Sequence, residues 1–381
     1  MKLSGVFRRV TTSGAFIPEI DGLRFVAIAS VVLFHVLAQL NRYYVVHVPI
    51  LVKDAVQNGN RGVQLFFVIS GFILALPFAK RHLCGGPRVS LARYFLRRLT
   101  RLEPPFVIAM LALAILIRLT SHLPVREIAP HLLATLGYCH SLVFGQLSSI
   151  APVAWSLEVE VQFYVLVPLL TYLFAIRNVS LRRGTIIAGM LAAGVAQTLI
   201  ATPEGGRFQL SIGYNLQFFL AGFLLADLFL CRKAPQKFLA WDLVSVIGWP
   251  AVFLLPAYSV QILLPFLIPI LYWAAFHGHG FNRLFRVPLV CCAGGMCYSI
   301  YLVHFAIIAA ATRLVGHSNV MAMISLSLVM TVCISAVYYL LIEKPCMNPR
   351  WPVALLLNMK RLSLSFGAGE NRPSSLFKEA G

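Results

Sequence analysis

The sequence predicts an all-helical protein that crosses a membrane many times. Of its 381 residues, 59% are hydrophobic and only 12% are charged, whereas a soluble domain of this size carries about 25% charged residues. The apolar residues form repeated runs of about 20, the length needed to span a bilayer as a helix. These runs lack the strict alternation of membrane β-strands, so we expect a bundle of helices and no outer-membrane barrel.

Ten apolar segments are predicted to be transmembrane helices. They lie at about residues 20–40, 61–79, 102–119, 153–176, 184–201, 211–230, 241–257, 260–276, 288–312 and 319–342. We expect one membrane domain over residues 17–346, between a cytoplasmic segment at 1–16 and a polar, disordered cytoplasmic tail at 347–381. The apolar stretch 129–147 is predicted to be a re-entrant or interfacial helix on the outer side, because counting it as a span would reverse every later loop.

The charged residues predict how these segments are oriented. Lys and Arg number 32 against 13 Asp and Glu, which gives a net charge of +19. Most of the basic residues fall in the loops that lie inside if the N-terminus is cytoplasmic, above all in the loop at 80–101. Cytoplasmic loops of membrane proteins carry this excess, so both termini are predicted to be cytoplasmic. Because the basic residues are spread between spans and do not form one arm, we expect no nucleic-acid partner.

The first predicted span carries an arginine and a histidine on one face. Arg24 and His35 are eleven residues apart, and a helix that turns about 100° per residue brings His35 back within about 20° of the face of Arg24. The rise of about 1.5 Å per residue separates them by about 16 Å, roughly half the hydrocarbon thickness of a bilayer. Ionisable groups at this depth usually face a wet cavity or a protein interior, so we expect both side chains along one polar passage.

Two other segments place polar candidates at or inside spans. Arg98 and Arg101 are spaced i, i+3 before the third span, so both side chains lie on one helix face and suit bidentate contacts to phosphate. The ordinary basic character of an inner loop explains them equally well. Ser70, followed by Gly71 in the second span, indicates a close helix contact more than a nucleophile, because no acid partner surrounds it in the sequence.

The start of the fourth span contains two carboxylates in an apolar context, Glu158 and Glu160, just after Trp155. Residues at i and i+2 point to different faces of a helix, so only one of the two is expected to face the bundle interior. A buried carboxylate there tends to hold a proton or to pair with a histidine. A structural ion pair with an arginine is the alternative.

A polar stripe is predicted in the ninth span, where Tyr298, Tyr301 and His304 follow one another at a spacing of i, i+3, i+6. The sequence Glu343-Lys344-Pro345 stands at the end of the next span. A lone histidine in such a helix is most often a satisfied core residue, and the accompanying tyrosines favour a functional role.

Taken together, these motifs resemble the acyltransferase 3 family of integral membrane O-acyltransferases over residues 17–346. The family's DGLR sequence with histidine at an R-x10-H interval is met by Arg24 and His35, and its FFVISGF sequence by residues 66–72. The other matches are RRxxRIxP at Arg97, Arg98, Arg101 and Pro104 (with Leu102 for isoleucine), WSLxxExQFY at 155–164, SIYLxH at 299–304 and EKP at 343–345.

The resemblance implies transfer of an acyl group, most commonly acetyl, from acyl-CoA to a hydroxyl of a carbohydrate. It implies ten core spans, and we expect a bacterial cytoplasmic (inner) membrane. Larger members add a C-terminal esterase-like domain, which this chain is expected to lack. The acceptors then expected are O-antigen, exopolysaccharide, lipo-oligosaccharide or a glycosylated small metabolite such as an antibiotic.

For this reaction the residues take specific expected roles. Arg24, Arg98 and Arg101 hold the phosphates of acyl-CoA, and its pantetheine arm delivers the thioester toward His35. His35 acts as general base on the acceptor hydroxyl or as a transient acyl acceptor. Glu160 orients His35 or the incoming hydroxyl. The supporting residues are Ser70, Trp155, Tyr301 and His304.

Two other classes of function stay open from the sequence. A transporter or flippase for a lipid-linked sugar also uses membrane-buried Arg, His and Glu, although no inverted repeat is visible. A passive membrane scaffold would tolerate replacement of His35 and Glu160. The eight cysteines include no CxxC pair, so no metal is expected. The expected partners are acyl-CoA, a carbohydrate acceptor that is free or lipid-linked, and membrane lipids; the oligomeric state is open, a dimer included.

Overall fold

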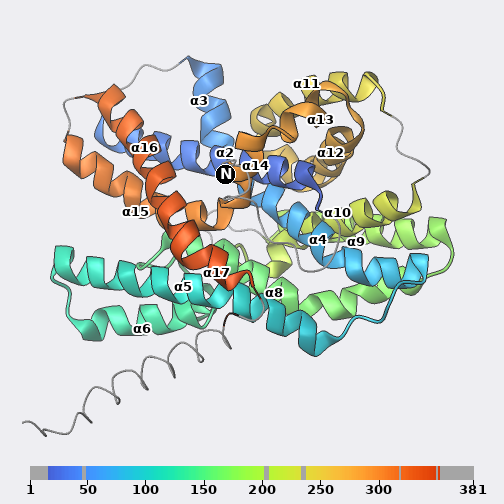
Figure 1. Cartoon of the computed structure of the whole chain (residues 1–381), viewed down its shortest axis with the longest axis horizontal. Helices are drawn as coiled ribbons and strands as arrows, with labels where there is room; N and C mark the ends of the chain where they lie inside the picture. Colours follow the sequence, from blue (N-terminus) through green and yellow to red (C-terminus); the bar gives the residue numbers. More distant parts are fainter. Residues whose placement is uncertain are drawn as a thin grey trace, which may run out of the picture.

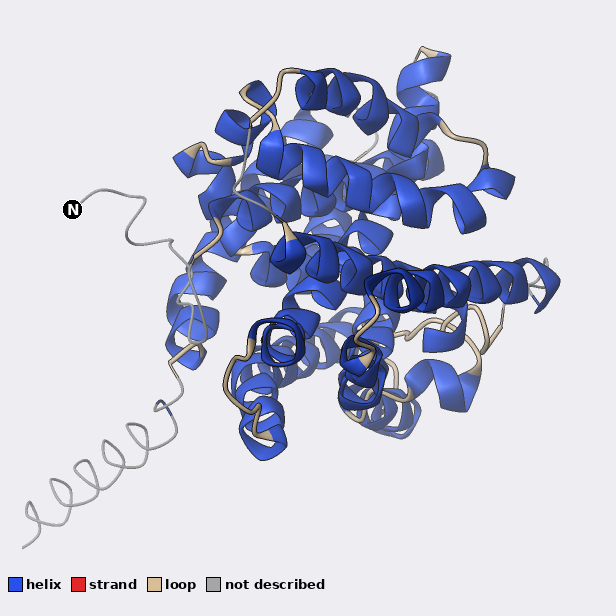
Figure 2. Cartoon of the chain, turned by 90° about the vertical axis from the view of Figure 1, so that its right-hand side faces the viewer, coloured by secondary structure: helices blue, strands red, loops and turns tan. Residues whose placement is uncertain are grey.

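The computed structural model describes residues 16–44, 49–200, 206–232, 237–316, 319–348 and 351. Within these ranges the fold is helical and has no strand (Figure 2), as the sequence predicts. Eight helical segments of the described part are long and apolar enough to cross a membrane. The predicted cytoplasmic segment, apart from Phe16, and nearly all of the predicted tail lie outside the described residues.

The first half of the chain forms α2 (Pro18–Tyr43), α3 (Ile50–Gln57), η1 (Asn58–Arg61), α4 (Gly62–Cys84), α5 (Leu91–Ser121), α6 (Val125–Leu136), α7 (His140–Phe144), η2 (Pro152–Ala154), α8 (Trp155–Leu170), η3 (Thr171–Ala175) and α9 (Val179–Ile200). The second half forms α10 (Ile212–Cys231), α11 (Ala240–Leu254), α12 (Ala257–His277), α13 (Gly280–Phe285), α14 (Pro288–Gly295), α15 (Cys297–Val315), α16 (Val320–Tyr338), η4 (Tyr339–Glu343) and α17 (Lys344–Cys346).

Every predicted span falls on helices of this set. The candidate membrane spans do not include α11 or the stretch from Ile262 to His277 in α12, which are shorter apolar helices. The ninth predicted span is divided between α14 and α15. The count of ten spans and the cytoplasmic placement of the termini therefore stay predictions.

The stretch 129–147 is not one continuous helix. It contains most of α6 and all of α7, which are separated by a turn in which Tyr138 has a positive φ of 52°. Neither helix is long enough to be among the candidate spans. Figure 1 shows that α6 runs back along α5, with which it is in contact.

Helices α4 and α10 approach each other unusually closely at two glycines. A Cβ atom on Gly222 would lie 2.4 Å from the backbone nitrogen of Phe72, and one on Gly71 would lie 2.2 Å from the carbonyl oxygen of Phe219. Small residues permit this approach of two helix backbones in a membrane. Because Gly71 makes the close contact, the neighbouring Ser70 is directed elsewhere, toward the site described below.

The kinked helix α5 is held by side chains from the C-terminal part of the chain. Pro104 lies inside α5 and has no N–H, so the carbonyl of Thr100 loses its helical partner. The indole of Trp351 donates a 2.8 Å hydrogen bond to that carbonyl. Tyr298 of α15 donates to the carbonyl of Leu102 at 2.9 Å. These bonds fix the region of α5 that carries the predicted arginines.

Candidate functional site

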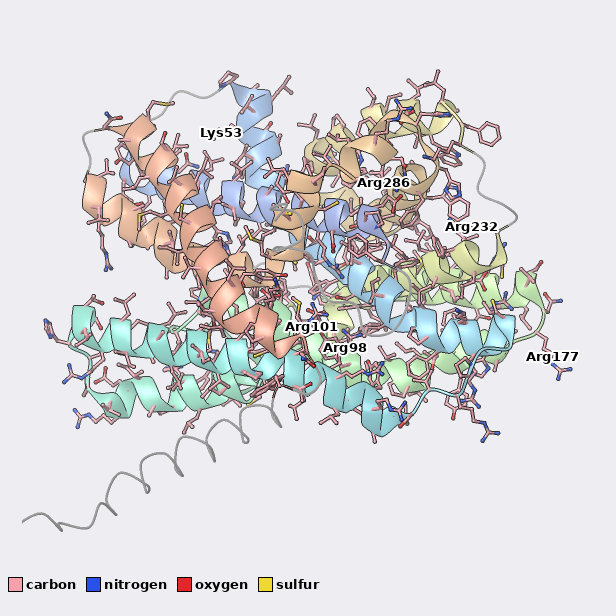
Figure 3. The ribbon with its side chains drawn as sticks, in the orientation of Figure 1. Lys53, Arg98, Arg101, Arg177, Arg232 and Arg286 are labelled. Atoms are coloured by element: carbon pink, nitrogen blue, oxygen red, sulfur yellow. The ribbon has the colours of Figure 1, made fainter. Side chains whose placement is uncertain are left out.

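A cavity of about 530 Å³ lies among α2, α4, α5, α8 and α15. Its charged lining residues are Asp21, Arg24, Lys80, Arg88, Arg93, Arg97, Arg98, Arg101, Glu160 and Glu343. Cations outnumber anions in this set, so the cavity favours an anionic ligand. In Figure 3 the labelled Arg98 and Arg101 lie close together near the middle of the molecule, whereas Arg177 lies at its right-hand rim.

Arg24 enters the cavity from the first turns of α2. Its Nη1 donates to Oδ1 of Asp21 at 2.5 Å, and its side chain is only 11% exposed. The two residues are spaced i, i+3, which places them side by side on the helix. The ion pair holds the guanidinium at the cavity wall.

Arg98 and Arg101 line the same cavity from α5, on one side of the helix as their spacing predicts. The guanidinium of Arg98 lies 5.8 Å from the ring centre of Tyr164, close enough for a cation–π interaction. The Nε of Arg101 is buried and has no hydrogen-bond partner within the described part of the chain. An unpaired buried donor is unusual, and an anionic ligand would satisfy it.

Ser70 and Glu160 form a hydrogen-bonded pair in the cavity wall. The Ser70 hydroxyl donates to Oε1 of Glu160 at 2.6 Å, and both side chains line the cavity. This acid partner could not be predicted from the sequence around Ser70, because Glu160 lies 90 residues further along the chain. The pair brings α4 and α8 together at the site.

The two carboxylates of α8 have different surroundings, as their spacing predicts. Glu160 faces the cavity, whereas Glu158 is fully buried on the side of α7. Oε2 of Glu158 accepts a 2.9 Å hydrogen bond from the backbone N–H of Ser141 at the start of α7. Glu158 therefore anchors the α6–α7 segment, and Glu160 is the carboxylate available to a ligand.

His35 is paired with His304 and not with Glu160. Nε2 of His304 lies 3.3 Å from Nδ1 of His35, across 269 residues of sequence. Nδ1 of His35 is also 2.9 Å from the carbonyl oxygen of Val31. Phe34 and Phe305 face the ring of His35 edge-on, at centroid distances of 5.0 and 5.3 Å. The imidazole is thus held by aromatic contacts and by a second histidine.

Tyr301 lines the cavity and lies near His304, with the two ring centres 6.2 Å apart. Its hydroxyl donates to the carbonyl of Val153 and lies 3.0 Å from Oγ of Ser156. It lines the cavity one helical turn before His304 on α15. From the predicted set, the cavity is lined by Arg24, Ser70, Arg98, Arg101, Glu160 and Tyr301.

The remaining predicted residues, His35, His304 and Trp155, are not part of the cavity lining. Trp155 instead packs edge-on against Phe67, with ring centres 6.4 Å apart. The passage expected to join Arg24 with His35 therefore stays a prediction: Arg24 lines the cavity, and His35 is not among its lining residues.

Among the cationic lining residues, Lys80, Arg88 and Arg93 had no expected role, and Arg97 was expected only as part of the RRxxRIxP motif. Arg93, Arg97 and Arg101 are spaced i, i+4, i+8 on α5, and all three line the cavity. This spacing puts them on one helix face. The signal was present in the sequence but is also produced by the ordinary basic character of an inner loop.

Glu343 connects the EKP motif at 343–345 with the SIYLxH motif at 299–304. Its Oε2 accepts hydrogen bonds from the backbone N–H of Ser299 at 3.0 Å and from the Ser299 hydroxyl at 2.5 Å. Glu343 is almost fully buried and lines the cavity. Among the described residues, no group of three or more His, Cys, Asp or Glu side chains is placed to bind a metal ion.

Comparison with known proteins gives one family and a set of distant relatives. A family model described as an acyltransferase domain matches residues 17–340. A protein of Staphylococcus aureus (strain COL) named "Putative O-acetyltransferase" is 24% identical over 331 residues, which cover 77% of this chain and 51% of the relative. "O-acetyltransferase OatA" of Staphylococcus aureus (strain NCTC 8325 / PS 47) is 22% identical over 368 residues, covering 87% and 57%. The chain spans about half the length of these relatives, and no solved structure matches it significantly.

Proposed function

The chain belongs to the acyltransferase 3 family, and from this membership we propose that it is a membrane enzyme that moves an acyl group from acyl-CoA to a carbohydrate hydroxyl. The observation that carries the proposal is one cavity in which Arg24, Arg98 and Arg101 meet the Ser70–Glu160 pair. A cationic pocket inside an apolar helical bundle suits a ligand with an anionic head and an uncharged arm.

The donor in this proposal is acyl-CoA, with acetyl-CoA the first choice because the relatives are named O-acetyltransferases. Its nucleotide phosphates are multiply charged, and arginine pairs with phosphate through two parallel hydrogen bonds. Arg98 and Arg101 hold the phosphates from α5, and Arg24 stands opposite on α2. The pantetheine arm is thin enough to pass between helices toward Tyr301.

The chemical step depends on His35. Its imidazole takes the proton of the acceptor hydroxyl while the oxygen attacks the thioester carbonyl; the C–S bond then breaks and the CoA thiolate receives the proton. Glu160, fixed by Ser70, orients the hydroxyl or the thioester on the cavity side. Tyr301 lines the cavity beside His304, so the thioester and acceptor approach the histidine pair from the Tyr301 side of the cavity. An acyl-His35 intermediate is the variant of this mechanism.

The acceptor is proposed to be a cell-surface carbohydrate such as O-antigen, exopolysaccharide or lipo-oligosaccharide. The protein then lies in a bacterial cytoplasmic (inner) membrane, with the arginines on the side where acyl-CoA is made. A glycosylated small metabolite fits the same chemistry, because its sugar also carries hydroxyl groups.

Release of CoA from acetyl-CoA by the purified protein in lipid nanodiscs tests the proposal. We expect release that rises with added acceptor carbohydrate and is lost in His35→Ala. His277→Ala is a matched control, because His277 is also a buried helical histidine, bonded through Nδ1 to the carbonyl of Trp273 at 2.8 Å. Movement of a lipid-linked sugar without any loss of thioester would instead favour a transporter. Mass spectrometry of envelope glycans from cells with and without the protein identifies the acceptor by one added acetyl group.

A further inference from the structure

The hydrogen bonds of His304 determine which of its ring nitrogens carries the hydrogen. Nδ1 of His304 lies 3.0 Å from the carbonyl oxygen of Ile300 and 2.9 Å from that of Tyr301. A carbonyl oxygen can only accept, so Nδ1 must be the donor. In a neutral ring the other nitrogen then holds a lone pair. Nε2 of His304 is therefore a hydrogen-bond acceptor.

The same reasoning applies to His35. Its Nδ1 lies 2.9 Å from the carbonyl oxygen of Val31, which again makes Nδ1 the donor. The second neighbour of that nitrogen is Nε2 of His304 at 3.3 Å, the long end of the hydrogen-bond range. The Nδ1–H of His35 thus lies between two acceptors, and both rings are neutral.

Nε2 of His35 is left with a lone pair on accessible surface. No hydrogen bond to this atom occurs within the described residues, and the atom is not among the buried side-chain nitrogens that lack a partner. The atom therefore keeps some accessible surface. Of the four ring nitrogens in the pair, this one alone has a lone pair without a hydrogen-bond partner among the described residues, as a general base requires.

We propose that His35 and His304 form a neutral dyad in which His304 positions His35, and that Nε2 of His35 is the base of the reaction. This inference rests on the proposed acyl transfer. When Nε2 of His35 takes the proton of the acceptor hydroxyl, the ring becomes an imidazolium whose Nδ1–H donates more strongly to Nε2 of His304 and to Val31. The proton on Nε2 then goes to the CoA thiolate, and both rings return to the neutral form.

A neutral imidazole here takes the position that a carboxylate holds in the serine-hydrolase triads. A carboxylate would stabilise the imidazolium more strongly but would place a further anion in an apolar helix pair, where charge is costly. His304 is fully buried, and a neutral acceptor avoids that cost. His304 is accordingly a positioning residue, since it acts through His35 and not on the substrate.

Solid-state NMR of the ¹⁵N-histidine-labelled protein tests the dyad directly. We expect protonated Nδ1 and bare Nε2 in both rings, with the two sets of signals assigned by their loss in His35→Ala and His304→Gln. A protonated Nε2 on either ring at neutral pH would overturn the dyad. This measurement does not depend on turnover, so it stands apart from the proposed function, which fails if the wild-type protein releases no CoA.

Kinetics test whether His304 positions the base. We expect His304→Ala to lower kcat by about 10²-fold or more, the range of general-base catalysis, with the KM for acetyl-CoA unchanged. His304→Gln keeps an amide oxygen that can accept from His35, so it should recover part of kcat. The control His277→Gln should leave kcat and the His35 signals unchanged. Equal losses in both His304 variants that parallel their losses of thermal stability would show a purely structural role and overturn the proposal.

Discussion

The Ser70 hydroxyl donates a 2.6 Å hydrogen bond to the Glu160 carboxylate, joining α4 to α8 at the wall of the cationic cavity. The geometry depends on the next residue of α4, because Gly71 lets α10 approach and thereby turns Ser70 toward α8. The Ser70-Gly71 pair, which the sequence predicts to be a close helix contact, thus serves two purposes. Gly71 packs against α10, and Ser70 holds the Glu160 carboxylate in the wall of the cavity that the arginines line.

Replacing Glu160 should reduce turnover far more than stability. Glu160→Gln keeps an oxygen that can accept from Ser70 but removes the charge that orients a hydroxyl, so we expect kcat to fall by about 10²-fold. Glu158→Gln is the matched control on the same helix, because Glu158 anchors Ser141 and faces away from the cavity. It should lower the unfolding temperature with little change in kcat per folded molecule. If Glu158→Gln instead lowered kcat and Glu160→Gln lowered only the unfolding temperature, Glu158 would be the functional carboxylate and Glu160 the structural one.

Removing an α5 arginine should weaken recognition of the nucleotide part of the donor. We expect Arg98→Gln and Arg101→Gln each to raise the KM for acetyl-CoA by about 10-fold, the effect of losing one charge-assisted bond of about 1.5 kcal/mol. Acetyl-pantetheine has no nucleotide, so its KM should not change.

The control for this experiment is Arg177→Gln, which removes an exposed arginine near the rim of the molecule (Figure 3). It should leave both KM values unaltered. If acetyl-CoA and acetyl-pantetheine are weakened equally by the α5 variants, the arginines do not contact the nucleotide.

Helical periodicity predicted those parts of the site that lie on a single helix. The i, i+3 spacing placed Arg98 and Arg101 on one side of α5, and the i, i+2 spacing separated Glu158 from Glu160. Both relations depend only on the turn angle of a helix. The family was identified for the same reason, because its motifs are local in sequence and the match to residues 17–340 confirms it.

Contacts between helices that are far apart in the chain could not be predicted from the sequence. The sequence around Ser70 shows no acid partner, and Glu160 was expected to orient His35 or the incoming hydroxyl. The structure instead joins Ser70 with Glu160 and His35 with His304. These pairings depend on how α2, α4, α8 and α15 pack, and no spacing along one helix contains that information.

The α6–α7 segment should become less stable in acid because of His140. Burial lowers the pKa of the His140 imidazole; its hydrogen bond to the carbonyl of Gln146 opposes this, and the neighbouring His131 adds to it. The folded protein therefore takes up fewer protons than the unfolded chain, in which histidine has a pKa of about 6.5. The contribution of His140 to stability is then fully present above about pH 6.5 and is lost as the pH falls below that value.

Hydrogen exchange of the α6–α7 amides at pH 7.5 and pH 5.5 measures this effect. The charged and titratable groups around His140 are His131 on α6, Glu158 on α8 through Ser141, and Arg207, which donates to the carbonyls of Leu142 and Val143. We expect faster exchange at the lower pH in the wild type and a smaller difference in His140→Gln. Removal of the exposed His82 by His82→Gln should not change the difference. An unchanged pH response in His140→Gln would rule out His140 as its source.

Loss of the Glu343 carboxylate should loosen the start of α15. Oε2 of Glu343 accepts from both the backbone and the hydroxyl of Ser299. A buried hydrogen bond to a charged group contributes about 1.5–3 kcal/mol, so Glu343→Ala, which removes both bonds, should lower the free energy of unfolding by at least that amount. Ser299→Ala removes only the hydroxyl bond and should cost less. If the two variants lose the same free energy of unfolding, the hydrogen bond from the backbone N–H of Ser299 contributes nothing.

The close approach of α4 and α10 makes a last prediction that links packing to the site. A Cβ atom on Gly222 would meet the backbone nitrogen of Phe72 and the carbonyl oxygen of Val68, both at 2.4 Å, and neither backbone atom can rotate away as a side chain would. Gly222→Ala should therefore force the helices apart and destabilise the protein by about 1–3 kcal/mol or more. Gly184→Ala is the control: nothing lies within 4 Å of a Cβ placed there inside α9, so it should stabilise the helix by about 0.5–1 kcal/mol. Because α4 also carries Ser70, separation of the helices should lower kcat in Gly222→Ala even in the folded fraction, whereas Gly184→Ala should keep it. Equal activity per folded molecule in the two variants would show that the Ser70–Glu160 pair does not depend on this contact.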